Sequence, residues 1–285
     1  MNLAILLAFG AMVGWGLGDF LIQKSIKKIG AIETLCWISL FSSIILIPFV
    51  LTDLKNVTQP QLMTLIVLGL ANFASGYIHF KALNIGKLSV VEIIMSIELP
   101  LTILLGVLVF HESLSLIQIA LIFFLFVGIV LISIDPKQIH KKDFLEKGSL
   151  LAILSGVLIA IVNFGSASQA KEISPLMAIW LPWLICGLIC FAHISRRRLG
   201  KFISASQKNW RLIGIMVIVD LLAWASYVFA VAKEELAITI AITESYVVVA
   251  LVLGVIVNNE KITRIQYFGA GLAVTCSLLI GLASR

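Results

Sequence analysis

The chain has 285 residues, of which 60% are hydrophobic and 13% are charged. An ordinary soluble domain has about 45–50% apolar and about 25% charged residues, so the composition excludes a typical soluble protein. The formal net charge of +6 is not a nucleic-acid signal, because the basic residues lie in short connections between apolar stretches without interleaved stacking aromatics. The composition instead predicts an all-α integral membrane protein.

Apolar stretches of about 20 residues, long enough to cross about 30 Å of hydrocarbon as a helix, recur along the chain. The first begins at Leu3 with neither a basic segment before it nor a cleavage pattern after it, so we expect it to remain in the mature protein. In chain order, the stretches predict ten transmembrane helices, at residues 3–24, 32–52, 62–84, 88–110, 115–134, 148–170, 175–194, 210–232, 236–258 and 264–283.

The basic residues are distributed unevenly between the two sides of these predicted spans. Seventeen of the 21 Lys and Arg residues lie at the odd-numbered connections, and only Lys55, Lys171, Lys233 and Arg285 lie on the other side. Because positive residues concentrate on the cytoplasmic side, we expect the odd connections in the cytoplasm and both termini outside. The expected location is the plasma (inner) membrane of a prokaryote, as a multi-pass protein.

The two halves of the chain are related by a shift of 148 residues. Residues 88–112 then fall on residues 236–260, with Gly106 on Gly254, Glu112 on Glu260, and Gln118 on Gln266 just beyond. This indicates an internal duplication, with residues 1–135 as the first five-helix repeat, 136–147 as a cytoplasmic linker and 148–285 as the second repeat. Because five is an odd number of spans, the second repeat enters the membrane inverted, around a central cavity.

Acidic residues occur at membrane depth. Glu98 and Glu244 lie near the middle of spans four and nine, Asp220 lies near the middle of span eight, and Asp19 lies in the inner half of span one. An ionisable side chain at such depth costs about 2.5–3.5 kcal/mol, so it rarely persists without a cavity or a partner. The 148-residue shift places Asp220 on Asn72 and places Glu244 two residues from the image of Glu98.

Aromatic and polar residues share helix faces with these acids. Trp224 and Tyr227 follow Asp220 at i+4 and i+7. His79 follows Asn72 at i+7, and Trp15 precedes Asp19 by four residues. An acid beside aromatic rings suits an organic cation, through charge and cation–π attraction. The candidate substrate-binding or proton-coupling residues are Trp15, Asp19, Asn72, His79, Glu98, Asn163, Asp220, Trp224, Tyr227 and Glu244.

Structural explanations exist for the same residues. A buried carboxyl group can be protonated and hydrogen-bonded to a neighbouring helix, aromatic rings can anchor at the interface, and Asn72 can bridge two helices. Glu92 is close enough to Lys87 for a structural ion pair, which we favour over a functional role. For Glu112 and Glu260, helix capping and a gate contact are both open, and capping is favoured.

Other features favour packing roles. Gly10, Gly14 and Gly18 share one face of span one and permit close helix approach, while Pro100 and Pro182 should bend spans four and seven. The four cysteines, Cys36, Cys186, Cys190 and Cys276, lie inside apolar spans and are interpreted as small apolar packing residues. The sequence predicts no metal site, no cofactor and no catalytic residue.

Several short motifs together resemble a known family. They are Trp15-Gly16, the stretch from Ser96 to Pro100, Glu112, and the stretch from Ile173 to Leu176. In order and spacing, across both halves, they are similar to the EamA family of the drug/metabolite transporter superfamily. The resemblance implies a ten-helix basket with a central cavity that transports small metabolites. The second half departs from the first, with Ser245-Tyr246 in place of Ile97-Glu98 and no counterpart of Pro100.

These features predict a secondary active transporter that works by alternating access and carries a small polar metabolite, an amine or an amino acid-like compound. A low dielectric favours the protonated form of a carboxyl group, so exchange of protons for substrate is the hypothesised coupling. We expect no nucleic-acid partner, the lipid bilayer as surroundings, and a monomer or a homodimer. The alternative is a channel or a structural membrane subunit without carrier activity. A membrane enzyme is disfavoured, because no nucleophile, metal or phosphate-binding motif is present.

Overall fold

The computed structural model describes residues 2–85, 91, 94–134, 147–197, 199–258 and 262–283, and over these residues it is helical with no strand. The helices are α1 (Leu3–Ile29), α2 (Ala31–Leu54), α3 (Gln59–Ile85), α5 (Glu98–Val109), α6 (Leu116–Ser133), α7 (Lys147–Glu172), α8 (Pro175–Arg197), α9 (Leu199–Lys208), α10 (Trp210–Val231), α11 (Leu236–Thr243), α12 (Tyr246–Asn258) and α13 (Arg264–Ala283).

Within the described residues, nine helical segments are long and apolar enough to cross a membrane, and α5 is a shorter apolar helix. The predicted all-helical membrane fold is therefore confirmed. Nine of the ten predicted spans have a helical segment of membrane length among the described residues, whereas span four has only the shorter α5 there. The helices extend further at some ends: α1 continues to Ile29 and α3 begins at Gln59. Most of the predicted linker, together with Lys87, Glu92 and Glu260, lies outside the described residues.

The sequence predicted spans four and nine as continuous helices. In the structure, each of these spans contains a turn near its middle. The first turn lies at residues 96–97, just before α5, and the second lies at residues 244–245, between α11 and α12. The N–H of Ile97 donates to the Ile94 carbonyl at 3.1 Å, and the N–H of Ser245 donates to the Ile242 carbonyl at 3.2 Å. These two bonds are 148 residues apart, so both halves break the same span at the same position.

Proline explains only one of the two breaks. Pro100 has no N–H for the carbonyl of Ser96, four residues before it, which weakens the helix where the first turn forms. Val248 is the counterpart of Pro100, and its N–H donates to the Ser245 carbonyl at 3.0 Å. The second turn therefore forms without proline. In span seven, α8 continues past Pro182 to Arg197.

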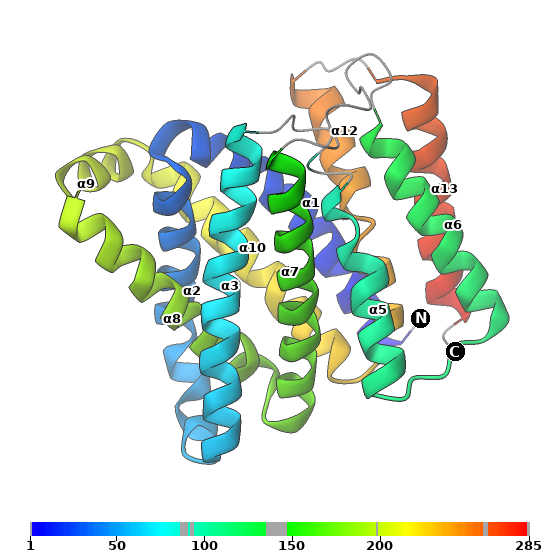
Figure 1. The fold of residues 1–285 in the computed structure, drawn as a ribbon, viewed down its shortest axis with the longest axis horizontal. Coiled ribbons are helices and arrows are strands. Elements are labelled where there is room, and N and C mark those ends of the chain that lie inside the picture. Colours follow the sequence, from blue (N-terminus) through cyan, green and yellow to red (C-terminus); the bar gives the residue numbers. More distant parts are fainter. Residues whose placement is uncertain are drawn as a thin grey trace.

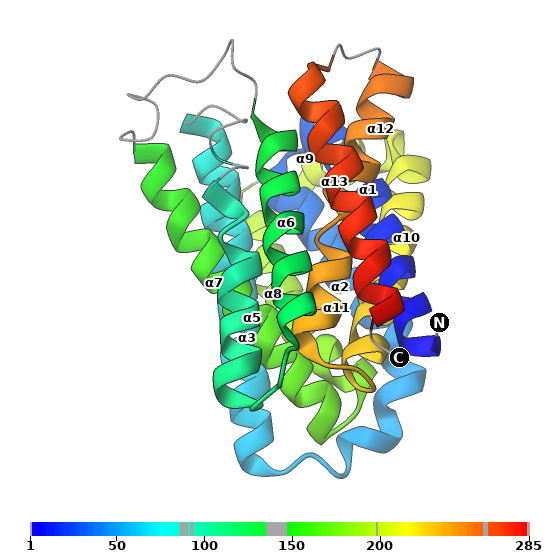
Figure 2. The same cartoon turned by 90° about the vertical axis from the view of Figure 1, so that its right-hand side faces the viewer.

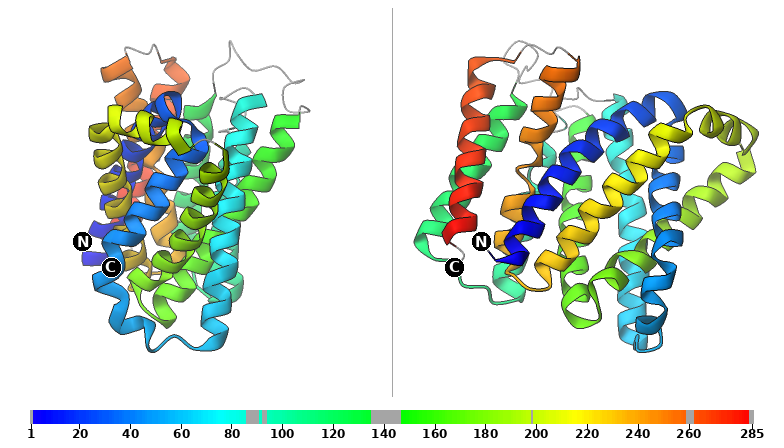
Figure 3. Two further views of the ribbon diagram at one scale, coloured as in Figure 1. Left: turned by 90° about the vertical axis from the view of Figure 1, so that its left-hand side faces the viewer. Right: turned by 180° about the vertical axis from the view of Figure 1, so that it is seen from behind.

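The helices are arranged in neighbouring pairs along the long axis of the molecule. Helices α6 and α13 lie side by side at one end, α2 and α8 lie together toward the other end, and the pairs α1–α10 and α3–α7 lie between them (Figures 1 and 3). The two chain ends lie close together at one end of the bundle (Figure 2). This arrangement places the broken spans in the middle of the molecule.

Glycines permit close contact between α6 and α13. A Cβ on Gly128 of α6 would lie 2.8 Å from the backbone nitrogen of Ala273 in α13, and one on Gly269 would lie 2.7 Å from the Gly128 carbonyl oxygen. Contacts this short exclude any side chain, so the α6–α13 pair depends on both glycines.

The predicted glycine face of α1 packs against α10. A Cβ on Gly14 would lie 2.7 Å from the Cβ of Ala223, whereas at Gly10 and Gly18 the nearest α10 atoms would be at least 3.6 Å away. Gly16, on another face, has no room for a Cβ beside Val249 of α12. These approaches hold α1, with Trp15 and Asp19, between α10 and α12.

Two further features complete the fold. No helix was predicted between spans seven and eight, yet α9 forms there, with Phe202 buried and the side chains of Lys201 and Lys208 exposed. All four cysteines are free and buried, as expected for packing residues. Among the described residues, no group of three or more His, Cys, Asp or Glu side chains is arranged to hold a metal ion.

Candidate functional site

The two helix breaks bring a pair of acidic residues together. Glu98 is the first residue of α5, and Glu244 is the C-cap of α11. Their side chains are joined by a hydrogen bond. A hydrogen bond between two carboxyl groups requires a proton on one of them, so this contact between the two halves of the chain suits a shared proton.

A small cavity adjoins this acid pair, with a volume of about 50 Å³. This is enough for a few water molecules and too small for a metabolite. His79 of α3 is close enough to Glu98 to interact electrostatically with it. The lining residues are His79, Met95, Ser96, Glu98, Ile129, Ser133, Glu244, Tyr246 and Val247.

Two aspartates extend the acidic region into α1 and α10. Asp19 is within electrostatic range of Glu98, Glu244 and Asp220. Asp220 is only 5% exposed, and its Oδ2 atom is buried without a hydrogen-bond partner in the described part of the protein. Four carboxyl groups from four helices therefore converge at the centre of the bundle.

Aromatic rings cover one side of this acidic region, and Trp15 is at the centre of the group. Its ring centroid is 5.1 Å from that of Trp224, 5.3 Å from that of Tyr227 and 6.3 Å from that of Tyr246. Trp183 of α8 extends the group, at 6.0 Å from Trp224. The indole N–H of Trp15 is buried and has no hydrogen-bond partner among the described residues, so it is available to a ligand or to water.

The remaining predicted residues are placed differently. Tyr227 is fully buried, and its hydroxyl donates to the backbone carbonyl of Asn163 at 3.1 Å. An interfacial anchor would face the headgroups, so that explanation is wrong for Tyr227. Asn163 itself is buried in α7. Asn72 is half-buried in α3 and is not among the residues that line the small cavity.

Sequence reasoning missed some members of this central region. The candidate residues named from the sequence include none on α6 or α8, yet α6 contributes Ile129 and Ser133, and α8 contributes Trp183. Tyr246 was noted only as a departure between the halves. One signal could have found it, because the 148-residue shift places Tyr246 on Glu98.

A second polar contact joins the residues after α5 to the start of α11. The Glu112 carboxylate accepts hydrogen bonds from the backbone N–H groups of Leu236 at 2.5 Å and Ala237 at 2.9 Å, at the start of α11. Lys171 Nζ lies 3.6 Å from the same carboxylate. We call these four residues the Glu112 latch. The sequence favoured capping for Glu112 and Glu260. The Glu112 carboxylate does cap a helix, but that helix is α11 of the other half, and Glu260 lies outside the described residues.

Local backbone geometry directs Glu112 toward α11. His111 has a φ of 56°, a left-handed conformation that reverses the chain after α5. The carboxylate then lies over Gly106, where a Cβ would come within 2.8 Å of Oε2. Burial raises the pKa of the nearby Glu235 carboxyl, and the Glu112 and Glu234 carboxylates raise it further.

The fold and this site define a class of protein: a multi-pass helical membrane protein with buried acids where two broken helices meet. The model of the EamA-like transporter family matches residues 2–134 and again residues 146–282. The chain therefore belongs to the EamA family, part of the drug/metabolite transporter superfamily. The family resemblance seen in the sequence is confirmed, and it makes this chain a membrane transporter of that type.

Comparison with solved structures supports the same fold. A solved chain described only as "Crystal structure of protein" superposes with a TM-score of 0.78, covering 99% of this chain and 97% of that chain at 15% sequence identity. An identity this low shows the fold alone. No curated protein matches the chain.

Proposed function

We propose that the protein is a secondary active transporter that exchanges a small amine or amino acid-like compound for protons. The proposal rests on one observation: the Glu98–Glu244 hydrogen bond joins two helix breaks that are equivalent in the two halves. In transporters with inverted repeats, broken helices near the bilayer midplane typically form the substrate and coupling-ion sites. The protein would act in the plasma membrane of a prokaryote, with ten spans and both termini outside.

Helix neighbours support two inverted five-helix repeats, residues 1–135 and 148–285 joined by the linker 136–147. Between the two repeats, α1 corresponds to α7, α3 to α10 and α5 to α12. The α1–α10 contact therefore corresponds to α7–α3, the α1–α12 contact corresponds to α7–α5, and all four pairs are in contact. The pairs α6–α13 and α2–α8 each join a helix to its own counterpart. A two-fold relation between the halves produces this pattern, and alternating access follows from two such halves rocking about a shared site.

The chemistry of the site favours a positively charged amine. An approaching cation would replace the proton shared by Glu98 and Glu244, and the rings of Trp15, Trp224 and Tyr246 would contribute cation–π attraction. Because proton and cation compete for the same carboxyl groups, inward movement of one is coupled to outward movement of the other. Asp19 and Asp220 would extend the path by which the proton leaves.

The Glu112 latch supplies a gate for this cycle. Its carboxylate ties the first half to the start of α11, so the two halves cannot separate at that end while the latch is formed. The positive-inside pattern places this end outside. We therefore assign this structure to a state closed toward the outside, with a central cavity too small to hold substrate.

Reconstituted vesicles test the proposal. We expect an imposed pH gradient to drive transport of one or more labelled amines or zwitterionic amino acids by the wild-type protein. Glu98→Gln or Glu244→Gln should abolish this dependence, because an amide cannot exchange the proton. Glu172→Gln, which changes an exposed carboxylate at the end of α7, is the matched control.

Two results would contradict the proposal: transport that ignores the pH gradient, or amide variants that behave like the wild type. Saturable counterflow of labelled against unlabelled substrate distinguishes a carrier from the alternative of a channel, and flux that requires a partner protein would indicate a structural subunit.

A further inference from the structure

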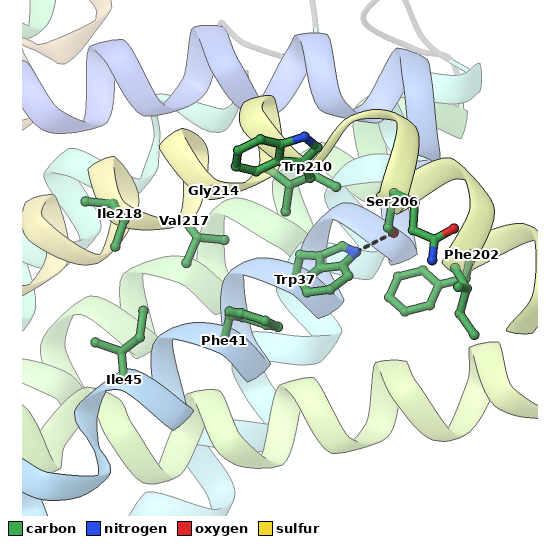
Figure 4. A pocket seen from close by; sticks show the side chains of 12 residues that line it. Trp37, Phe41, Ile45, Phe202, Ser206, Trp210, Gly214, Val217 and Ile218 are labelled. Carbon is green, nitrogen blue, oxygen red and sulfur yellow. Dashed lines mark hydrogen bonds between the residues drawn. The ribbon is translucent and has the colours of Figure 1, made fainter.

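A second cavity, much larger than the central one, lies at the outer surface of the bundle between α2, α9 and α10. Its volume is about 570 Å³, within the range of pockets that hold small organic ligands. Figure 4 shows Trp37, Phe41 and Ile45 of α2 facing Val217 and Ile218 of α10 across it, with α9 closing one end. We call it the α2–α10 groove.

The lining of this groove is almost entirely apolar. Apart from the indole N–H groups of Trp37 and Trp210, Ser206 and Gln207 supply the only polar side chains among the described residues that line it. The Ser206 hydroxyl already accepts a hydrogen bond from Trp37 Nε1 at 2.8 Å. The groove therefore offers little to a polar metabolite and suits a hydrocarbon chain. Phe41 and Ile218 remain exposed, so the groove opens sideways, toward the surrounding lipid.

The groove has a defined shape because α9 is fixed to α2. Besides the bond to Ser206, the Trp37 ring stacks on Phe202 at a centroid distance of 5.4 Å and packs against Phe41 at 4.6 Å. At Gly214 in the wall, a Cβ would meet no atom within 4 Å. The space is thus open beside Gly214 and bounded by fixed aromatic rings.

Two basic residues, Lys208 and Arg211, lie next to lining residues of the groove near α9. The segment from Arg196 to Arg211 contains six basic residues and no acidic one. Lys208 directly follows the lining residue Gln207, and the Arg211 guanidinium lies 5.4 Å from the ring centroid of Trp210, another lining residue. Basic residues on an amphipathic helix at a membrane surface attract anionic lipid headgroups.

We propose that the α2–α10 groove is a binding site for one anionic phospholipid, which seats an acyl chain beside Gly214 and its phosphate against Lys208 and Arg211. The apolar walls select a chain, and the basic rim selects the charge of the headgroup. A flat lipid-facing surface would provide neither the concave wall nor the cluster of positive charge. The site is separate from the central acids, so it stands whether or not the proposed proton exchange is correct.

Native mass spectrometry of the purified full-length protein tests the site. The protein is exchanged into detergent with equimolar phosphatidylglycerol and phosphatidylcholine of identical acyl chains, and the retained lipids are counted. We expect the wild type to retain one phosphatidylglycerol in preference to phosphatidylcholine. Gly214→Trp should lose this lipid, because the indole fills the groove.

The matched control is Gly271→Trp on α13, where a Cβ also meets no atom within 4 Å. It should retain the lipid. Equal retention by Gly214→Trp and wild type, or equal loss from both tryptophan variants, would overturn the proposal. Unfolding temperatures of the variants, measured with lipid removed, identify any variant that fails to fold.

The double variant Lys208→Gln and Arg211→Gln tests the headgroup separately and alters only exposed side chains. It should still retain one lipid but no longer prefer phosphatidylglycerol. Because neither position contributes to the groove's apolar wall, a preference equal to that of the wild type would overturn the assignment of these two residues. A wild type that retains both lipids equally would overturn the selection for anionic lipid altogether.

Discussion

Replacing Glu112 with glutamine should open the end of the transporter that the Glu112 latch closes. The carboxylate accepts two backbone hydrogen bonds, at 2.5 and 2.9 Å, and its side chain is only 5% exposed. Glutamine keeps one acceptor oxygen but turns an NH2 group toward the other backbone N–H. The variant therefore keeps the shape of the side chain, loses one charge-assisted bond and keeps the other only as a neutral bond.

The size of the effect follows from that loss. A hydrogen bond to a charged group contributes about 1.5–3 kcal/mol. The Lys171 side chain is 33% exposed, so solvent screens its ion pair with Glu112 and we assign that pair little weight. If the bond forms only in the closed state, its loss shifts the equilibrium toward the open state by about 10- to 150-fold.

Thiol labelling from outside measures this shift. Val247 lines the central cavity, and the four native cysteines are buried, so Val247→Cys provides a reporter with low background. We expect a membrane-impermeant maleimide to label it about 10- to 150-fold faster when Glu112→Gln is added. Glu172→Gln, an exposed carboxylate that accepts a bond from Ser168, should leave the rate unchanged. An unchanged or slower rate in a folded Glu112→Gln protein would refute the gating role.

Three further predictions concern packing and the second half. Gly14→Ala places a methyl group 2.7 Å from the Cβ of Ala223 and should lower the free energy of unfolding by about 1–3 kcal/mol, whereas Gly271→Ala, in open space, should not; equal unfolding midpoints would contradict this. Tyr227→Phe removes a buried hydrogen bond and should cost about 1 kcal/mol of stability, seen as a lower midpoint in thermal unfolding. Glu260, which lies outside the described residues, is the repeat counterpart of Glu112, so Glu260→Gln should slow labelling from outside in the same assay; faster labelling would contradict equivalent roles for the two glutamates.

The spans could be predicted from the sequence because a segment crosses the bilayer if it is long and apolar enough, and both properties can be read from that segment alone. The breaks at residues 96–97 and 244–245 could not, since a two-residue turn leaves both the apolar run and its length intact. Pro100 marks one break but has no counterpart at the other. Both breaks become evident only in the tertiary structure, where the carboxyl groups of Glu98 and Glu244 beside them meet across the two halves.

The acidic part of the site could be predicted and the aromatic part only in part. Asp19, Glu98, Asp220 and Glu244 stand out because a carboxyl group at depth is costly anywhere in an apolar span. Aromatic residues carry no such penalty, and in this protein they occur on both exposed and buried helix faces. Trp183 therefore could not be distinguished from a packing residue before its position beside Trp224 was known.

The hydrogen bonding of two tryptophans whose indole nitrogens are buried distinguishes a packing residue from a candidate binding residue. In the α2–α8 contact, the indole N–H of Trp180 donates to the Ser43 carbonyl at 3.0 Å, as expected of a residue that only packs. The Trp15 indole, beside the four acids, has no partner among the described residues, and neither does Oδ2 of Asp220. Unsatisfied buried polar groups cost about 1–3 kcal/mol each, and here they lie beside two broken helices. A site that binds a proton and a cation in turn requires groups left free to bind them, and the Trp15 indole N–H and Asp220 Oδ2 are two such groups next to the acidic region.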